Sequence, residues 1–151
     1  MVVSCFHSDV TATTTTGTSS STIREITVPA KTLARDGDSL DFHFCGQWDR
    51  TQLDFLGLES PTGWSVTVAG GGIPDEPNWA MDVRLTRNAS NTAILETVMF
   101  DAQVSVGPVP HITTVAMDHS AAFTLKVVAA VLNASYPVTM RTSRGLHMPV
   151  P

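Results

Sequence analysis

Five histidines and fourteen acidic residues are the side chains of this sequence that could hold a metal or move a proton. No two histidines have the i, i+4 spacing of a helical metal pair, and Cys5 and Cys45 lack the paired spacing of a zinc template, so we expect free thiols there. Asp118 and His119 fit a turn before the next strand, and the alternative is a cation site on a symmetry axis. We predict no metal and no cofactor. The histidines are His7, His43, His111, His119 and His147.

Catalysis by a carboxylate pair, as in glycoside hydrolysis, needs two acids held at a fixed distance. Asp75 and Glu76 are neighbours in a Gly/Pro-rich loop, so they point apart or into solvent. The sequence also lacks a G-x-S-x-G elbow, a papain-like cysteine and the Gly-Lys-Ser/Thr ending of a phosphate loop. We predict that the chain is not an enzyme and assign no catalytic residue. The other acids considered are isolated residues near turns, namely Asp49, Asp54, Glu59 and Asp101.

Two tryptophans beside turns could form a stacking surface for a sugar. These are Trp48 and Trp64. Packing in a core or an interface is the more common place for a tryptophan in a β domain. Glycan binding is therefore kept as an alternative to the main interpretation.

The composition favours one small domain without a polyanionic or lipid partner. The 151 residues suit a single core, with 42% hydrophobic residues, 15% charged residues and a net charge of -5. Without clustered Lys and Arg, direct nucleic-acid binding is not expected. The longest apolar run, Val127–Leu132, is far shorter than the roughly 20 residues that cross a bilayer, so no membrane partner is expected. The first six residues lack the basic flank and apolar stretch of a secretory signal.

Alternating apolar and polar residues predict β-strands throughout residues 22–151. The clearest run is 79–86, where the apolar side chains from Trp79 to Leu85 alternate with Asp82 and Arg84. Clusters of Gly, Pro, Asn and Asp separate the runs, and Gly37 in the Asp-Gly-Asp turn is expected to adopt a positive φ. No stretch has a helical period, so we predict an all-β domain, an antiparallel sandwich or barrel. Strands are expected at about 22–28, 40–44, 51–56, 64–68, 79–86, 93–100, 112–117, 121–131 and 138–142.

Residues 1–21 differ in composition and are expected to form an extended or disordered N-terminal arm. Ser8–Ser21 is almost wholly Thr, Ser, Ala and Gly, with nothing to bury against a core. Because Thr is β-branched and readily takes an extended form, such an arm can become ordered on a partner. The apolar patch in front of it would be the anchor, so Val2, Val3 and Phe6 are predicted to bind that partner.

The stretch Ile23–Phe44, reading IREITVPAKTLARDGDSLDFHF, resembles the opening of a recurrent phage and prophage virion domain. In that family a strand is followed by a Pro-Ala-x-Thr-Leu step, an x-Asp-Gly-Asp turn and an alternating strand. The strands Trp79–Arg87 and Ala121–Lys126 are similar as well. The likeness covers most of the chain after residue 21, and it is one of fold rather than of active site. The matching positions here are Pro29, Ala30, Thr32, Leu33, Asp36, Gly37, Asp38 and Leu40.

The resemblance implies a jelly-roll-like sandwich, commonly trimeric, as in head decoration proteins, head fibres and tail-fibre tips. Only a short arm precedes the domain, so the expected function is a structural protein of a tailed-phage virion. Its expected role is that of a decoration or cement protein on the capsid exterior, bound to the major capsid protein. The alternative is a receptor- or glycan-binding module of a head or tail fibre, with a host-surface glycan as partner.

One strand predicts where the subunits of a homotrimer would meet. The run Ala121–Val131 carries small or apolar residues on both faces, with Val128 and Ala130 on the second face. A sandwich strand that faces solvent should instead alternate apolar with polar residues. Together with the family likeness, this pattern predicts that Val128 and Ala130 contact a neighbouring subunit.

Overall fold

The computed structural model describes residues 3–60, 65–70, 78–101 and 110–150. These residues contain eleven β-strands and one short 3-10 helix, η1, at Arg50–Gln52. No helix in the described ranges is long and apolar enough to cross a membrane. The prediction of an all-β, antiparallel fold is confirmed. The strands are β1 (Ser4–Asp9), β2 (Thr13–Thr15), β3 (Ser21–Val28), β4 (Ser39–Gln47), β5 (Leu53–Glu59), β6 (Ser65–Gly70), β7 (Asn78–Ala89), β8 (Thr92–Asp101), β9 (Pro110–Ala116), β10 (Phe123–Val131) and β11 (Val138–Met148).

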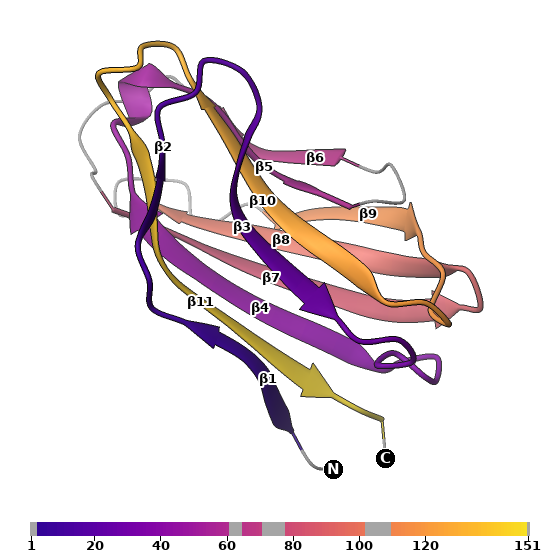
Figure 1. Ribbon diagram of the computed structural model, residues 1–151. Coiled ribbons are helices and arrows are strands. Elements are labelled where there is room, and N and C mark those ends of the chain that lie inside the picture. Colours follow the sequence, from indigo (N-terminus) through magenta and orange to yellow (C-terminus); the bar gives the residue numbers. More distant parts are fainter. Residues whose placement is uncertain (1–2, 61–64, 71–77, 102–109, 151) are drawn as a thin grey trace.

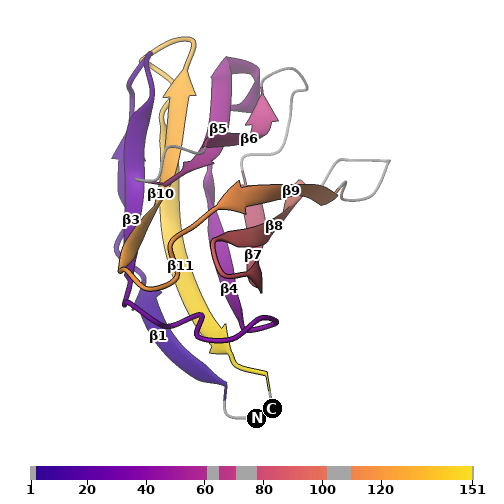
Figure 2. The same ribbon diagram turned by 90° about the vertical axis from the view of Figure 1, so that its right-hand side faces the viewer.

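The strands form two antiparallel sheets that pack against each other (Figure 1). The larger sheet has the order β1-β11-β4-β7-β8-β9, and β2 also pairs with β11. The smaller sheet has the order β3-β10-β5-β6. Strands from the two ends of the sequence, β1 and β11, lie side by side in both views (Figures 1 and 2).

The path of the chain between the sheets is that of a jelly roll. The neighbours β1, β11, β4 and β7 form one layer, and β3, β10, β5 and β6 form the other. The chain crosses between layers from β2 to β3, from β3 to β4, from β4 to β5, from β6 to β7, from β9 to β10 and from β10 to β11. The hairpin of β8 and β9 extends the larger sheet beyond these eight strands. The predicted jelly-roll-like sandwich is confirmed.

Side chains from the inner faces of both sheets form one hydrophobic core. The alternation predicted for β7 is present, since Trp79 and Met81 are buried while Asp82 and Arg84 are exposed. The same period of two places the polar partners of the core residues on the outer faces of the sheets. The core thereby fixes which side chains of the larger sheet are available to a ligand.

The N-terminal segment is part of the sandwich, which corrects the expectation of a separate arm. β1 pairs with β11 along the edge of the larger sheet, and β2 pairs with the start of the same strand. Phe6 packs edge-on against Phe42, with ring centroids 5.7 Å apart, and a Cβ on Gly145 would lie 2.6 Å from its ring. The β-branched residues that suggested an extended arm are equally suited to an edge strand. Residues 4–9 and 13–15 therefore belong to the sandwich.

Polar contacts also hold this segment in place. His7 Nε2 lies 2.7 Å from Ser143 Oγ, and burial lowers the pKa of His7. Arg24 forms an ion pair with Asp9. Among the predicted anchor residues, Val3 is half exposed, Phe6 is turned toward the core, and Val2 lies outside the described residues. The predicted partner contact of Phe6 is therefore replaced by a contact within the chain.

Val128 and Ala130 are 2% and 0% exposed within a single chain, which removes the reason for placing them at a subunit contact. Their strand, β10, lies between β3 and β5. Ser20, which precedes β3, donates a hydrogen bond to Glu59 of β5, and this contact bridges across β10. The second apolar face that suggested a neighbouring subunit is thus explained by burial within the chain itself.

The Asp-Gly-Asp turn before β4 has the backbone expected of it. Gly37 has a φ of +93°, as predicted. Asp38 follows it and is 2% exposed. Its carboxylate accepts hydrogen bonds from the backbone N–H groups of Arg35 and Val150, at 2.8 and 2.9 Å. The turn therefore fastens the C-terminal segment after β11 to the start of β4.

Candidate binding site on the outer face of the larger sheet

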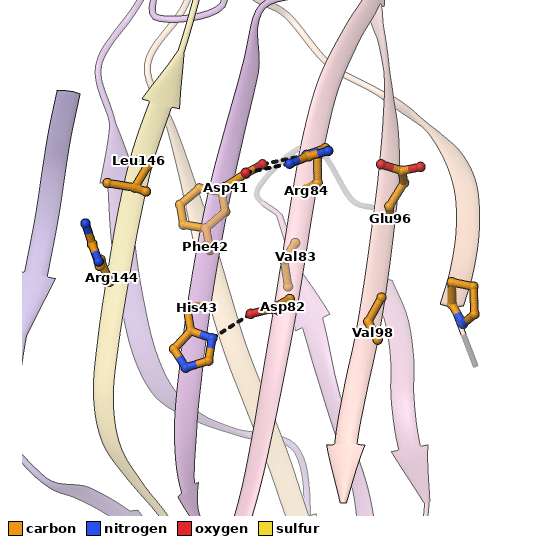
Figure 3. A pocket seen from close by; sticks show the side chains of 11 residues that line it. Asp41, Phe42, His43, Asp82, Val83, Arg84, Glu96, Val98, Arg144 and Leu146 are labelled. Atoms are coloured by element: carbon orange, nitrogen blue, oxygen red, sulfur yellow. Dashed lines mark hydrogen bonds and ion pairs between the residues drawn. The ribbon is translucent and has the colours of Figure 1, made fainter. Parts of the chain in front are cut away.

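A pocket of about 400 Å³ lies on the outer face of the larger sheet. Its lining comes from five neighbouring strands, β11, β4, β7, β8 and β9. Figure 3 shows how these side chains project from the strands. The lining residues are Asp41, Phe42, His43, Asp82, Val83, Arg84, Glu96, Val98, Pro110, Arg144 and Leu146.

The strand register arranges the outward-pointing side chains of the pocket in two parallel rows. Cross-strand partners in an antiparallel sheet point to the same face. Each row therefore runs across the strands, and the two rows are two residues apart along each strand. The first row is Arg144, His43, Asp82, Val98 and Pro110. The second row is Leu146, Asp41, Arg84 and Glu96.

Arg84 and Asp41 form the central ion pair of the pocket. Arg84 Nε and Nη2 each donate a hydrogen bond of 2.7 Å to a different oxygen of Asp41. These bonds raise the pKa of Arg84 despite its partial burial, and the charges of Asp41 and Glu96 act in the same direction. A two-point contact of this kind fixes both planar groups in one orientation.

The adjacent row contains a second polar pair. His43 Nδ1 lies 2.5 Å from Asp82 Oδ1, and their side chains are 52% and 51% exposed. Arg144 is the register partner of His43, and Glu96 is that of Arg84 (Figure 3). Within the described part of the chain, the side chains of Arg144 and Glu96 form no hydrogen bond, so their polar atoms are open to a ligand.

Apolar groups border these charges. Val98, Pro110 and Leu146 contribute to the lining itself. Beyond the pocket on the β8–β9 side, Phe100 and Ile112 are 41% and 61% exposed. The outer face of the larger sheet therefore combines oriented polar groups with exposed hydrocarbon.

Of the residues that the sequence singled out for chemistry, His43 lines the pocket, and the other described ones lie elsewhere. Trp48 is buried against Trp79, with ring centroids 5.8 Å apart, so it offers no stacking surface. His119 is buried and bonds the carbonyl of Thr92, and Asp118 accepts hydrogen bonds from Ser120 in a turn. No cluster of three metal-ligating side chains occurs among the described residues. Trp64, Asp75, Glu76 and the side chain of Asp101 lie outside them.

The pocket residues were not recognised from the sequence as a site. The alternation did predict that Asp41, His43, Asp82 and Arg84 face away from the core. It could not predict which of them are neighbours, because Asp41 and Arg84 are 43 positions apart. Their opposite charges on two exposed strand faces were the available signal.

Comparisons with known proteins give no family for this chain. No family model and no curated protein matches it. Among solved structures, the CBM2 module of the evolved Dit protein of Lactobacillus casei BL23 phage J-1 aligns with a TM-score of 0.43 and 7% identity. The alignment covers 84% of this chain and 69% of that chain. A similarity this weak assigns neither a ligand nor a role.

Proposed function

We propose that this chain is a non-enzymatic binding module of a tailed-phage virion, and that it binds a host-surface glycan in the pocket of the larger sheet. The pocket is the observation that carries the proposal. The virion context rests on the resemblance of Ile23–Phe44 to phage virion domains. Of the two roles considered for such a domain, the receptor- or glycan-binding role is the one that the pocket favours.

The pocket suits a saccharide because sugars present hydroxyl groups around an apolar ring. Carboxylates accept hydrogen bonds from hydroxyl groups, and guanidinium groups donate to their oxygens. Asp41 and Arg84 hold each other in one orientation, so a ligand meets them already ordered. Val98, Pro110 and Leu146 supply apolar contact beside them. A few oriented polar groups next to an apolar lining are typical of small-molecule sites.

Binding fits this arrangement better than hydrolysis does. A glycosidase needs one carboxylic acid that keeps its proton and a second carboxylate free to act. Asp41 is bound at both oxygens by Arg84, and Asp82 is in contact with His43. Both carboxylates are thus engaged with nitrogen donors, and among the pocket carboxylates only Glu96 accepts no side-chain hydrogen bond from the described residues. A single free carboxylate does not make a hydrolytic pair.

A second candidate is the role of a decoration or cement protein, attached to the major capsid protein on the capsid exterior. The exposed apolar side chains Phe100 and Ile112 favour it, because such groups often mark protein contacts. In this role the β8–β9 surface would replace the arm as the contact. A homotrimer, proposed from the family resemblance, would suit either role, since three linked pockets bind a repetitive surface more tightly than one.

An array of printed microbial surface glycans tests the proposed function. We expect the labelled full-length chain to bind a subset of the glycans, and Arg84→Ala to abolish that binding. The matched control is Lys126→Ala, which removes the ion pair of Lys126 with Glu25 on the smaller sheet. Absence of binding to every glycan, or equal binding by Arg84→Ala, would contradict the proposal.

A further inference from the structure

The pocket is elongated across the strands. Its lining uses two outward residues from each of β4, β7, β8 and β11, such as Asp41 and His43 of β4, and spans five strands from β11 to β9. Neighbouring strands are about 4.8 Å apart, so four spacings give a length of about 19 Å. Two residues along a strand give a width of only about 7 Å. An elongated ligand therefore fits with its long axis across the strands.

The charges along this axis alternate. Arg144 lies on β11, Asp41 on β4, Asp82 and Arg84 on β7, and Glu96 on β8. Apart from His43, three carboxylates and two guanidinium groups give the pocket a net charge of -1, on a chain whose net charge is -5. A polymer with an anionic group in each repeat would place negative charge beside carboxylates on three of the five strands. Like charges in such proximity oppose binding.

The two charged side chains of the pocket that form no hydrogen bond with the described residues lie far apart along the same axis. Arg144 on β11 and Glu96 on β8 are separated by three strand spacings, about 14 Å. One is a pure donor and the other a pure acceptor. A single sugar ring is too short to reach both, whereas a chain of several units can be held at both ends.

From these observations we infer that the ligand is an uncharged oligosaccharide of at least two units, lying across the strands with its ends contacted by Arg144 and Glu96. The inference rests on the proposed function and adds the charge class, the minimum length and the direction of the glycan. The paired residues Asp41 and Arg84 contact the middle of the ligand.

The array distinguishes the charge class, and fragments of a bound glycan distinguish the length. The array should carry uncharged bacterial polysaccharides beside uronate- and phosphate-containing ones. We expect the uncharged polymers to be bound. Fragments of one of them, from one to four units, are then titrated calorimetrically against the full-length chain, and the affinity should increase with length.

Two substitutions test the ends of the site. Arg144→Ala and Glu96→Ala should each lower the affinity for the longest fragment by about tenfold. This is the loss expected for one hydrogen bond to a charged group. Each should change the affinity for the monosaccharide much less. Lys126→Ala and Glu25→Ala, on the smaller sheet, are the matched controls and should bind like the unmodified chain.

The possible failures are distinguishable. Preferential binding of anionic polymers, an affinity independent of length, or undiminished binding by both end variants would overturn the inference while leaving glycan binding intact. Binding to none of the glycans would overturn both the inference and the proposed function. Thermal unfolding of each variant separates a lost contact from a lost fold.

Discussion

The outer faces of the two sheets are built by the same alternation and differ in what covers them. On the larger sheet, charged side chains from neighbouring strands surround an open pocket beside exposed Phe100 and Ile112. On the smaller sheet, the central strand β10 carries Val128 and Ala130, both buried. A hydrogen bond from Ser20, just before β3, to Glu59 of β5 joins the two neighbours of that strand.

This difference shows that exposure in the fold, and not polarity in the sequence, determines which face is open to a ligand. A strand with apolar residues on both faces suggests a partner. In β10, the second apolar face is buried within the same chain. From the sequence, the outward residues of the larger sheet are typical of an ordinary solvent-exposed face, and yet they line the pocket.

Removal of Met1–Ser21 should destabilise the chain strongly. The truncation deletes β1 and β2, the ring of Phe6 against Phe42, and the hydrogen bond of Ser20 with Glu59. Loss of the Phe6 contact alone is expected to cost about 3 kcal/mol. Urea unfolding followed by circular dichroism measures the change. If the truncated chain has the stability of the full chain, residues 4–9 and 13–15 are not part of the working sandwich.

A charge placed on the outward side of a strand should have unequal effects on the stability of the two sheets. Val128→Asp puts a carboxylate where the side chain is 2% exposed, and we expect a loss of about 3 kcal/mol or more. Val98→Asp, in the lining of the pocket, should change stability by only about 0.5 kcal/mol. Thermal unfolding of both variants measures the loss of stability on each face. Equal effects would mean that the two faces are equally accessible. A stable Val128→Asp chain that loses self-association would restore this face as a subunit contact.

The sequence predicted well which side chains of a strand point toward the core. It predicted poorly which of the outward side chains are buried by other parts of the chain. Alternation and turn composition are local properties. The inward residues of β7 and the positive φ at Gly37 could therefore be predicted from a few neighbouring residues in the sequence. The burial of Val128 and Ala130 depends on the tertiary fold, in which residues as far apart as Ser20 and Glu59, 39 positions, come into contact. The pocket depends on the register of five strands, which no local pattern specifies. The N-terminal strands were missed because a Thr-rich stretch is typical of both linkers and edge strands.

The turn carboxylates that lead into the central strands of the two sheets should differ in their effect on acid stability. Burial would raise the pKa of Asp38, but hydrogen bonds from the backbone N–H groups of Val150 and Arg35 outweigh it and lower the pKa from its ordinary 3.8. A folded-state pKa below the unfolded value means that the stabilisation is complete at neutral pH and is lost as the pH falls below about 4.

Asp38→Asn should therefore cost about 1–3 kcal/mol at pH 7 and flatten the decline of stability toward pH 2. The matched variant is Asp118→Asn in the exposed turn before β10. Hydrogen bonds from Ser120 lower the pKa of Asp118 as well, but solvent can replace them, so its effect should be smaller. Urea unfolding between pH 2 and 7 measures both. A larger effect from Asp118 would mean that the smaller sheet depends more on its turn than the larger one.

The smallest effect on stability should come from the ion pairs on the two faces. Arg84 with Asp41 and Lys126 with Glu25 are both cross-strand pairs in contact with solvent. Double-mutant cycles to alanine should give a coupling below about 1 kcal/mol for each, with the two-point Arg84 pair the stronger. A contribution this small means that the pair adds little to the stability of the fold. A ligand that meets two groups already held in one orientation binds more tightly, because less ordering is needed on binding. Glycan affinity should accordingly fall in either single variant of the Arg84 pair and stay unchanged in either variant of the Lys126 pair. A coupling energy of several kcal/mol for the Arg84 pair, with unchanged glycan affinity in its single variants, would contradict this expectation. The pair would then stabilise the fold and have no part in binding.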